Sequence, residues 1–204
     1  MRKRHSNGNN IVTNERGVEL DYSSNNTIAR NEVTANNVGI ILWHSSNNTV
    51  SENKIIKNNE DGAYLVSSSN NRFYHNNFID NPKQVGLHET GYTTVWDDGY
   101  PSGGNYWSDL NPPDEDLDQI GDTPYVIDED NLDRYPLIYP YGFVPSPDVN
   151  DDGTVNIKDL FLVARAFGTI PGESNWNPIA DVTMDEIINI RDLFEVAKDY
   201  GKTV

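Results

Sequence analysis

The first part of the chain consists of short runs of alternating apolar and polar residues, separated by polar turns. Three runs align at Gly17, Gly39 and Gly62, and each continues as Gly-x-x-Leu before a Ser-Ser-Asn-Asn turn. The three glycines are 22 and 23 residues apart. Alternation of period two is typical of β-strands, and a repeat of this length is typical of solenoids. The pattern therefore predicts a right-handed parallel β-helix of about three coils, one coil per repeat.

Stacked coils would place equivalent side chains above one another in ladders. The expected apolar ladders inside the solenoid are Val18, Leu20, Ile40, Leu42, Ala63 and Leu65; Ile28, Val50 and Phe73; and Ile11, Val33 and Ile56. The expected asparagine ladders at the turns are Asn14, Asn36 and Asn59; Asn26, Asn48 and Asn71; and Asn31, Asn53 and Asn76. Asparagine tolerates the left-handed backbone conformation, and its amide can bond to the same amide one coil away.

The repeat motif of residues 6–82 resembles the NosD-type repeats of the carbohydrate-binding and sugar-hydrolase (CASH) group of β-helices. The resemblance implies a carbohydrate-associated β-helix, and the NosD name is associated with periplasmic copper delivery. The four histidines, His5, His44, His75 and His88, do not recur at one position of the repeat. The chain has no cysteine and only two methionines. Because copper sites favour such ligands, the sequence gives copper little support.

An enzyme of this architecture would need acidic or basic groups clustered on one outward face. Glu19 and Asp21 lie on the same expected strand face, which is compatible with a glycosidase pair and equally with two solvated outward residues. Trp43, His44, Tyr22 and Tyr64 suit a sugar-stacking face or ordinary outward aromatics. We therefore assign no catalytic residue. The alternative is the C-terminal part of a polysaccharide hydrolase or lyase whose catalytic coils precede Met1.

Residues 83–144 are rich in aromatic residues, glycine, proline and acids, and resemble the segment that closes NosD-type helices. We expect them to cap the last coil with Trp96, Tyr106, Trp107, Tyr125 and Tyr135. The run from Asp114 to Asp122 has acids at alternate positions, as a hard cation requires, but Gln119 replaces the usual glycine. A bound Ca²⁺ and a solvated acidic turn both remain open for this run.

The strongest chemical motif begins at Asp148, where a twelve-residue Ca²⁺ loop is expected. Such loops place oxygen ligands at positions 1, 3, 5, 7, 9 and 12 and turn sharply at a glycine at position 6. Gly153 occupies position 6. The expected ligands are Asp148, Asn150, Asp152, the main-chain carbonyl of Thr154, Asn156 acting through water, and Asp159 in place of the usual glutamate.

The motif recurs 33 residues later, in a weaker form. The expected ligands of the second loop are Asp181, Thr183, Asp185, the main-chain carbonyl of Ile187 and Asp192, and Asn189 keeps the residue type of position 9. Thr183 is a weaker, neutral ligand at position 3. Glu186 stands at position 6, where it must either adopt a positive φ or distort the loop. The second loop is therefore expected to bind Ca²⁺ less tightly than the first.

Each loop leads into a short amphipathic helix that ends near Gly168 or Gly201. The expected apolar stripes are Leu160, Phe161, Ala164 and Phe167 in the first helix, and Leu193, Phe194, Ala197 and Tyr200 in the second. Neither helix is long enough to be stable alone, so we expect the stripes to pack together around the metal loops.

Residues 145–204 resemble a type I dockerin, a Ca²⁺-binding module that attaches proteins to cohesin domains. Pro145, Pro147, Pro171 and Pro178 disfavour the entering helices that a paired EF-hand sensor would require. The resemblance implies that loop positions 10 and 11 help to select the partner. These positions hold Ile157, Lys158, Ile190 and Arg191. The similarity of the two pairs is compatible with two symmetric binding modes.

Composition narrows the choice of partners. The net charge is −17, and residues 97–152 contain 15 acids and one basic residue. Nucleic acid and anionic membranes are disfavoured because they would repel such a chain. Arg2, Lys3 and Arg4 suit a signal peptide, but no apolar stretch follows them. The sequence thus predicts a mainly β protein with a small α tail. We expect it to be a non-catalytic extracellular or cell-surface module with Ca²⁺ as its cofactor. Its expected partner is a cohesin-like domain, and polysaccharide is a second possible ligand.

Overall fold

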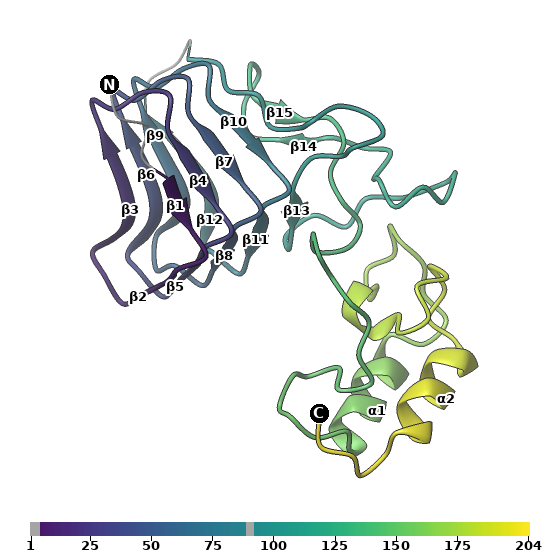
Figure 1. Ribbon diagram of the computed structural model, residues 1–204. Coiled ribbons are helices and arrows are strands. Elements are labelled where there is room, and N and C mark those ends of the chain that lie inside the picture. The colour runs from purple at the N-terminus through teal and green to yellow at the C-terminus, as the bar shows by residue number, and fades with distance from the viewer. Residues whose placement is uncertain (1–4, 89–91) are drawn as a thin grey trace. The chain divides into compact units, whose positions relative to one another are not determined.

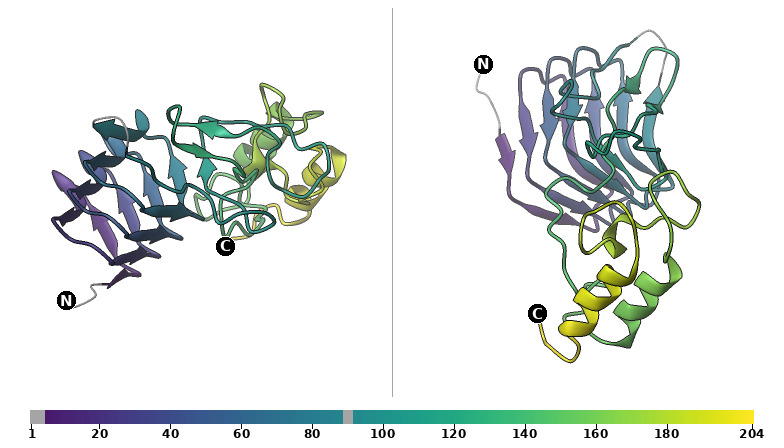
Figure 2. Two further views of the ribbon diagram at one scale, coloured as in Figure 1. Left: turned by 90° about the horizontal axis from the view of Figure 1, so that it is seen from above. Right: turned by 90° about the vertical axis from the view of Figure 1, so that its right-hand side faces the viewer.

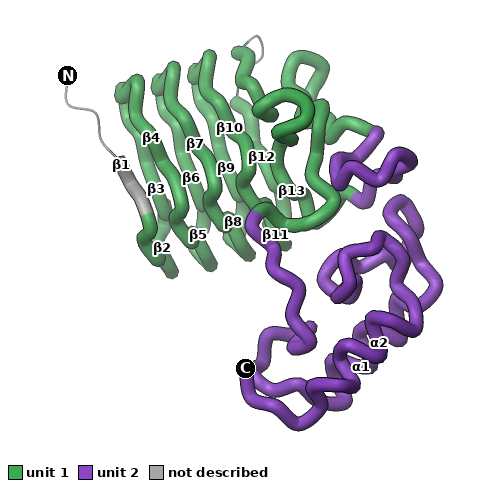
Figure 3. Tube along the Cα trace, turned by 45° about the vertical axis from the view of Figure 1, so that its right-hand side comes forward, with its two compact units in different colours: residues 1–110, 123–141 green, residues 111–122, 142–204 purple. Residues whose placement is uncertain are grey.

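The computed structural model describes residues 5–88 and 92–204 (Figure 1). The chain forms two compact units (Figure 3). The solenoid unit comprises residues 1–110 and 123–141, and the helical unit comprises residues 111–122 and 142–204. The chain therefore leaves the solenoid unit after residue 110, contributes residues 111–122 to the helical unit, and re-enters the solenoid unit at residue 123.

The solenoid unit is a parallel β-solenoid of four coils, one more than the sequence predicts (Figure 2). Three strands make each coil and contribute to three parallel sheets. The strands are β1 His5–Asn7, β2 Asn10–Val12, β3 Arg16–Asp21, β4 Thr27–Ala29, β5 Glu32–Thr34, β6 Val38–Trp43, β7 Thr49–Ser51, β8 Lys54–Ile56, β9 Asp61–Val66, β10 Arg72–Tyr74, β11 Asn77–Ile79 and β12 Lys83–His88. The fourth coil lacks the Gly-x-x-Leu motif in β12, so its repeat is hard to see in the sequence.

The first two apolar ladders are confirmed. Val18 pairs with Ile40 and Leu20 with Leu42, and the same columns continue through the later coils. The second ladder, from Ile28 to Val50 and Phe73, follows the register of β4, β7 and β10. These side chains belong to one buried core.

The third ladder is wrong at its last member. Val33 pairs with Ile55, which is fully buried, whereas Ile56 pairs with Thr34 and is only partly buried. The corresponding asparagine ladder contains Asn58 rather than Asn59. The reason is the position of the extra residue in the 23-residue repeat. The extra residue comes after Asn58 in the chain, so the residues up to Asn58 are still 22 positions away from their counterparts in the preceding coil.

The asparagine ladders hold the coils together through buried amides. The Asn53 side-chain oxygen accepts hydrogen bonds from the main-chain and side-chain nitrogens of Asn31, at 3.0 and 2.9 Å. Its side-chain nitrogen donates to the carbonyl oxygens of Ile28 and Ser51. The residue before each ladder asparagine takes the positive φ, as Glu52 does at 58°. The ladder asparagines are therefore selected for their amides and not for the left-handed conformation.

Aromatic side chains continue the interior ladders beyond the fourth coil. Trp96 lies 4.6 Å from Phe73, and Trp107 in β13 (Tyr106–Trp107) lies 4.4 Å from Phe78, between ring centroids. Tyr125 in β14 (Tyr125–Val126) stacks on Trp107 at 4.1 Å. Trp96 and Trp107 are fully buried, as expected of a cap.

Asp133, in β15 (Leu132–Asp133), is a buried hydrogen-bond acceptor that links residues of the segment after the fourth coil. Its fully buried carboxylate accepts hydrogen bonds from Trp107 Nε1 at 2.9 Å, from the Asn105 main chain at 2.7 Å and from the Tyr135 main chain at 3.1 Å. Burial raises the pKa of Asp133 to about 6, and these hydrogen bonds act in the opposite direction. Tyr135 itself lies beside Tyr100.

The helical unit contains α1 (Ile157–Arg165), the short 3₁₀ helix η1 (Pro178–Ala180) and α2 (Ile190–Lys198). Asn156 and Asn189 cap the two α-helices, and Asp159 and Asp192 complete capping boxes. The buried core consists of Val149, Val155, Val163, Ala166, Ala180, Ile188 and Val196.

The predicted apolar stripes are wrong in part. Leu160 and Leu193 do pack against the core, but the buried helix residues are Val163 and Val196. Phe161 and the other apolar residues of both stripes, namely Ala164, Phe167, Phe194, Ala197 and Tyr200, are exposed. Both faces of each helix are apolar, so spacing alone does not show which face is buried.

Candidate metal centre

The first loop folds around the carboxylate of Asp148, which is buried. Asp148 accepts hydrogen bonds from the main-chain nitrogens at positions 5 and 6, Asp152 at 3.2 Å and Gly153 at 2.8 Å. Asp152 in turn accepts one from the main chain of Thr154 at position 7. These bonds give the chain the turn of a Ca²⁺ loop, but the carboxylate oxygens of Asp148, Asp152 and Asp159 do not all lie within 4.8 Å of one another, and Asp152 pairs with Lys158 instead.

The second loop repeats this geometry. Asp181 accepts from the main-chain nitrogens of Asp185 at 3.3 Å and Glu186 at 2.8 Å. Asp181, Asp185 and Asp192 bring carboxylate oxygens within 4.8 Å of one another. Three acidic oxygens at such distances repel one another unless a cation lies between them. The donor set, made entirely of oxygen, suits a hard cation such as Ca²⁺.

Position 6 adopts a left-handed conformation in both loops. Gly153 has a φ of 83° and Glu186 a φ of 60°. Position 4 does the same, at Asp151 and Met184. Glu186 therefore accepts the strained backbone that the sequence required of it, and the loop keeps its shape.

The last ligand position is shared between metal loop and helix. Asp159 is fully buried and accepts hydrogen bonds from the main chains of Asn150 at 3.1 Å and Asn156 at 2.7 Å. Asp192 makes the equivalent bonds with Thr183 and Asn189. The same carboxylate thus closes the loop and starts the helix. Asn156, predicted as a metal ligand, caps α1, and Asn189 caps α2 in the same way. An asparagine just before a helix is the usual signal of this role, and it could have been recognised in the sequence.

Four residues were expected to contact a partner, and all four are exposed. Ile157 and Ile190 begin the two helices with two thirds of their surface accessible. Lys158 forms an ion pair with Asp152 at 2.8 Å, and Arg191 pairs with Asp185 at 3.2 Å. The two loops are thus matched in their ion pairs as well as in their ligands.

A third acidic group lies in the same unit. Asp114, Asp116 and Asp118 bring carboxylate oxygens within 4.8 Å of one another. Glu186 is buried, and its Oε2 atom has no hydrogen-bond partner. Burial, together with the neighbouring carboxylates of Asp114, Asp181 and Asp118, raises the pKa of Glu186 to about 7.

The possible catalytic acids and the histidines of the solenoid unit do not form comparable clusters among the described residues. Glu19 is exposed and paired with Arg16, and Asp21 is exposed. His44 stacks on Tyr22, and His75 stacks on Tyr141. Within the described residues, no histidine belongs to a group of three or more metal-ligating side chains.

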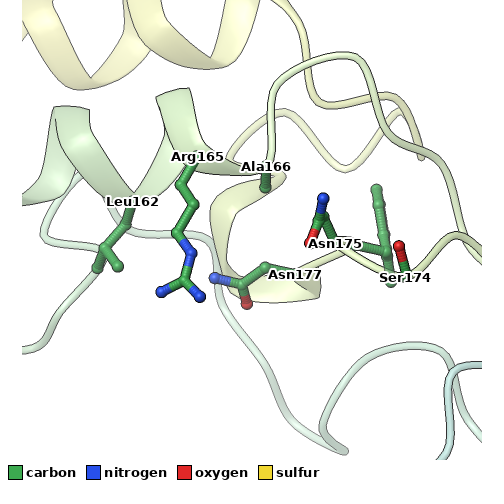
Figure 4. A pocket seen from close by; sticks show the side chains of 7 residues that line it. Leu162, Arg165, Ala166, Ser174, Asn175 and Asn177 are labelled. Atoms are coloured by element: carbon green, nitrogen blue, oxygen red, sulfur yellow. The ribbon is translucent and has the colours of Figure 1, made fainter.

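Surface depressions lie on both units. One, on the helical unit, is lined by Leu162, Arg165, Ala166, Ser174, Asn175, Trp176 and Asn177 (Figure 4). It measures about 210 Å³, which is small for an organic ligand. The other, on the solenoid unit, is lined by Glu15, Arg16, Asn37, Val38, Ile41, Trp43, Glu60 and Tyr64. Ile41 and Val66 alternate with the interior residues of β6 and β9, so period two would place them outward, but both are buried.

Fold and loops together define a β-solenoid protein that carries a dockerin-type attachment module. Residues 2–112 match the family described as periplasmic copper-binding protein (NosD), and because this is more than half of the chain, the protein belongs to that family. Residues 146–199 match the type I dockerin domain, a kind that generally binds Ca²⁺ and cohesin domains. No curated protein and no solved structure matches the chain significantly. No helix among the described residues is long and apolar enough to cross a membrane.

Proposed function

We propose that the dockerin domain, residues 145–204, binds Ca²⁺ at both loops and attaches a non-catalytic, extracellular β-solenoid to a cohesin-like partner. The ligands are those named above: Asp148, Asn150, Asp152, Thr154, Asn156 and Asp159 in the first loop, and Asp181, Thr183, Asp185, Ile187 and Asp192 in the second. The close carboxylates of Asp181, Asp185 and Asp192 in the second loop, and the same main-chain turn around Asp148 in the first, support this assignment.

The observation that carries the proposal is a pair of matching apolar surfaces. Ile157 and Phe161 on α1 are 65% and 64% exposed, and their counterparts Ile190 and Phe194 on α2 are 67% and 65% exposed. These pairs are separated by four residues, so each lies along one face of its helix. Large exposed apolar side chains on a small domain mark an interaction surface. Because the two helices present the same residues, either could dock first.

Ca²⁺ binding would also prepare this surface. Lys158 and Arg191 now pair with Asp152 and Asp185, which are the position-5 ligands. Coordination of these aspartates to Ca²⁺ would weaken both ion pairs and release the two cations beside the apolar faces. A partner with acidic residues around an apolar patch would be complementary to this arrangement.

The test measures binding of the full chain to a panel of immobilised type I cohesin domains, with Ca²⁺ and with chelator. We expect Phe161→Ala or Phe194→Ala alone to weaken binding little, because the other helix can dock. The double variant should lose at least about tenfold in affinity. Ile170→Ala, an exposed apolar residue outside both helices, is the control. Unchanged binding by the double variant, or no binding by any cohesin in Ca²⁺, would contradict the proposal.

We also propose that the solenoid unit contacts polysaccharide at the depression beside Trp43. Trp43 is exposed and Tyr64 lines the same depression, with charged and amide groups around them. Aromatic faces bordered by polar groups are suited to sugar rings. Screening the chain against oligosaccharides should show binding that Trp43→Ala abolishes and that the exposed Tyr100→Ala preserves. Equal loss in both variants would contradict a site at Trp43.

A further inference from the structure

The segment 111–122 folds against the dockerin domain although it is far from that domain in the sequence. Gly172 donates from its main-chain nitrogen to the Asn111 side chain at 3.2 Å, and Asn111 donates to the main-chain oxygen of Glu173. Pro113 lies against Gly172, where a Cβ atom would be 3.2 Å away. The segment is thus held in place by the connector between the two helices.

This segment has the conformation of the first half of a Ca²⁺ loop. Asp114 accepts from the main-chain nitrogens of Asp118 at 3.3 Å and Gln119 at 2.8 Å, as Asp148 and Asp181 do in the two dockerin loops. Asp118 accepts from Ile120 at 2.9 Å, which matches position 5 of those loops. Leu117 and Gln119 take the positive φ values that positions 4 and 6 require.

The segment lacks an acid at the last ligand position. Counting from Asp114, position 12 is Tyr125, which lies in the solenoid unit. Asp122, at position 9, accepts a hydrogen bond from the Glu115 main chain at 2.7 Å and so closes the turn. A cation held by Asp114, Asp116 and Asp118 would therefore need a carboxylate from another part of the chain.

Glu186 is placed to supply it. The side chain is 4% exposed, and its Oε2 atom is buried without a hydrogen-bond partner. The side chain lies beside the carboxylates of Asp114 and Asp118. A buried carboxylate that faces other carboxylates is costly unless a cation neutralises the group. Its presence at position 6, where glycine would relieve the backbone, also needs a reason other than the second loop itself.

We propose that Asp114, Asp116, Asp118 and Glu186 hold a third Ca²⁺, shared between the segment 111–122 and the second dockerin loop. The four carboxylates give the ion an all-oxygen, strongly acidic environment, which hard divalent cations prefer. The third ion would tie the segment to the dockerin domain through Glu186. This site is additional to the two dockerin loops and does not depend on their partner.

The test counts Ca²⁺ per full-length chain by calorimetric titration and by metal analysis after dialysis. The wild type should bind three ions. Glu186→Gly should bind two, because it removes the carboxylate and gives the second loop its usual glycine. Asp116→Asn combined with Asp118→Asn should lose the same ion. Glu115→Gln, an exposed acid in the same segment, is the matched control and should bind three.

The outcomes separate this site from the dockerin loops. Two ions in the wild type, or three in Glu186→Gly, would overturn the third site and leave the dockerin loops intact. If Glu186→Gly binds one ion, Glu186 serves the second loop and the proposal is wrong. Helical circular dichroism in Ca²⁺ should be the same in all variants, which excludes unfolding as the cause.

Discussion

Asparagine serves two purposes in this chain, according to where it lies. In the solenoid, buried asparagines such as Asn53 bond to main-chain groups of neighbouring coils. In the dockerin domain, Asn156 and Asn189 bond to main-chain groups of their own helices. In both places the side-chain amide bonds to main-chain groups. These groups are buried in the solenoid and exposed at the helix starts.

Replacing one ladder asparagine should therefore destabilise the solenoid strongly. Asn53→Ala removes buried hydrogen bonds to the Asn31 nitrogen and the Ile28 oxygen, at a cost of at least about 2 kcal/mol. Asn59→Ala removes a bond to Asn37 at the exposed surface and should cost far less. Urea unfolding followed by tryptophan fluorescence would measure both. Similar losses in the two variants would contradict the role of the buried ladder.

Removing Asp148, at position 1 of the first loop, should weaken Ca²⁺ binding more than removing Thr183, at position 3 of the second loop. Asp148→Ala removes the central carboxylate of the first loop and should reduce affinity there by at least about tenfold, or 1.4 kcal/mol. Thr183→Ala removes a neutral hydroxyl, which now donates to Asp192 at 2.8 Å, and should have a smaller effect. Calorimetric titration of each variant would show the difference. Equal losses would contradict this ranking of the ligands.

At the scale of strands, the sequence predicts the solenoid well, except for register. Period two and the glycine spacing locate the coils, and they place Ile40, Leu42 and Phe73 correctly in the core. They give Ile56 and Asn59 as ladder residues where the structure has Ile55 and Asn58, because a spacing of 23 does not show where in the repeat the extra residue lies. A shift of one residue turns a strand inside out, so this ambiguity exchanges the core residue for its neighbour.

This register can be tested with adjacent residues in one strand. Ile55→Ala creates a cavity in the core and should destabilise the solenoid by about 2–5 kcal/mol. Ile56→Ala, made next to it on the other face of β8, should cost clearly less. Thermal unfolding of the two variants would rank them. A larger loss for Ile56→Ala would mean that the register is wrong.

At the scale of helices, the Ca²⁺ loops are predicted from spacing because metal geometry constrains the sequence tightly. The packing of α1 and α2 is not, because Leu160 and Phe161 are adjacent and both apolar. Which of them faces the core depends on how the partner helix approaches. The role of Glu186 is also invisible in the local sequence, since its neighbours Asp114 and Asp118 come from another segment.

For the whole molecule, metal removal should affect the two units differently. The helical unit brings several carboxylates together and has a small core, so we expect its fold to depend on Ca²⁺. Each site contributes about 2.7 kcal/mol when free Ca²⁺ is 100 times its dissociation constant. The solenoid unit is held by its apolar and asparagine ladders and should not respond.

Chelator should therefore abolish the helical circular dichroism signal while the solenoid still unfolds at its usual temperature. Differential scanning calorimetry would show one transition that moves with Ca²⁺ and one that does not. Asp133→Asn, which lies in the solenoid unit, should lower only the second transition. A single transition that shifts as a whole with Ca²⁺ would contradict the independence of the two units.

In the dockerin domain, the residues after each helix form main-chain hydrogen bonds with the metal loop of the other repeat. The Val155 nitrogen donates to the Lys202 oxygen at 3.0 Å, and the Gly201 nitrogen donates to the Val155 oxygen at 2.8 Å. In the other repeat, Ile188 makes the same two bonds with Gly168 and Thr169. Residues that follow the second helix thus belong to the first loop, and those that follow the first helix belong to the second. Each repeat therefore depends on main-chain partners from the other. A chain shortened at Asp199 would lack the bonds that Gly201 and Lys202 form with Val155, and we expect it to bind Ca²⁺ more weakly at the first loop.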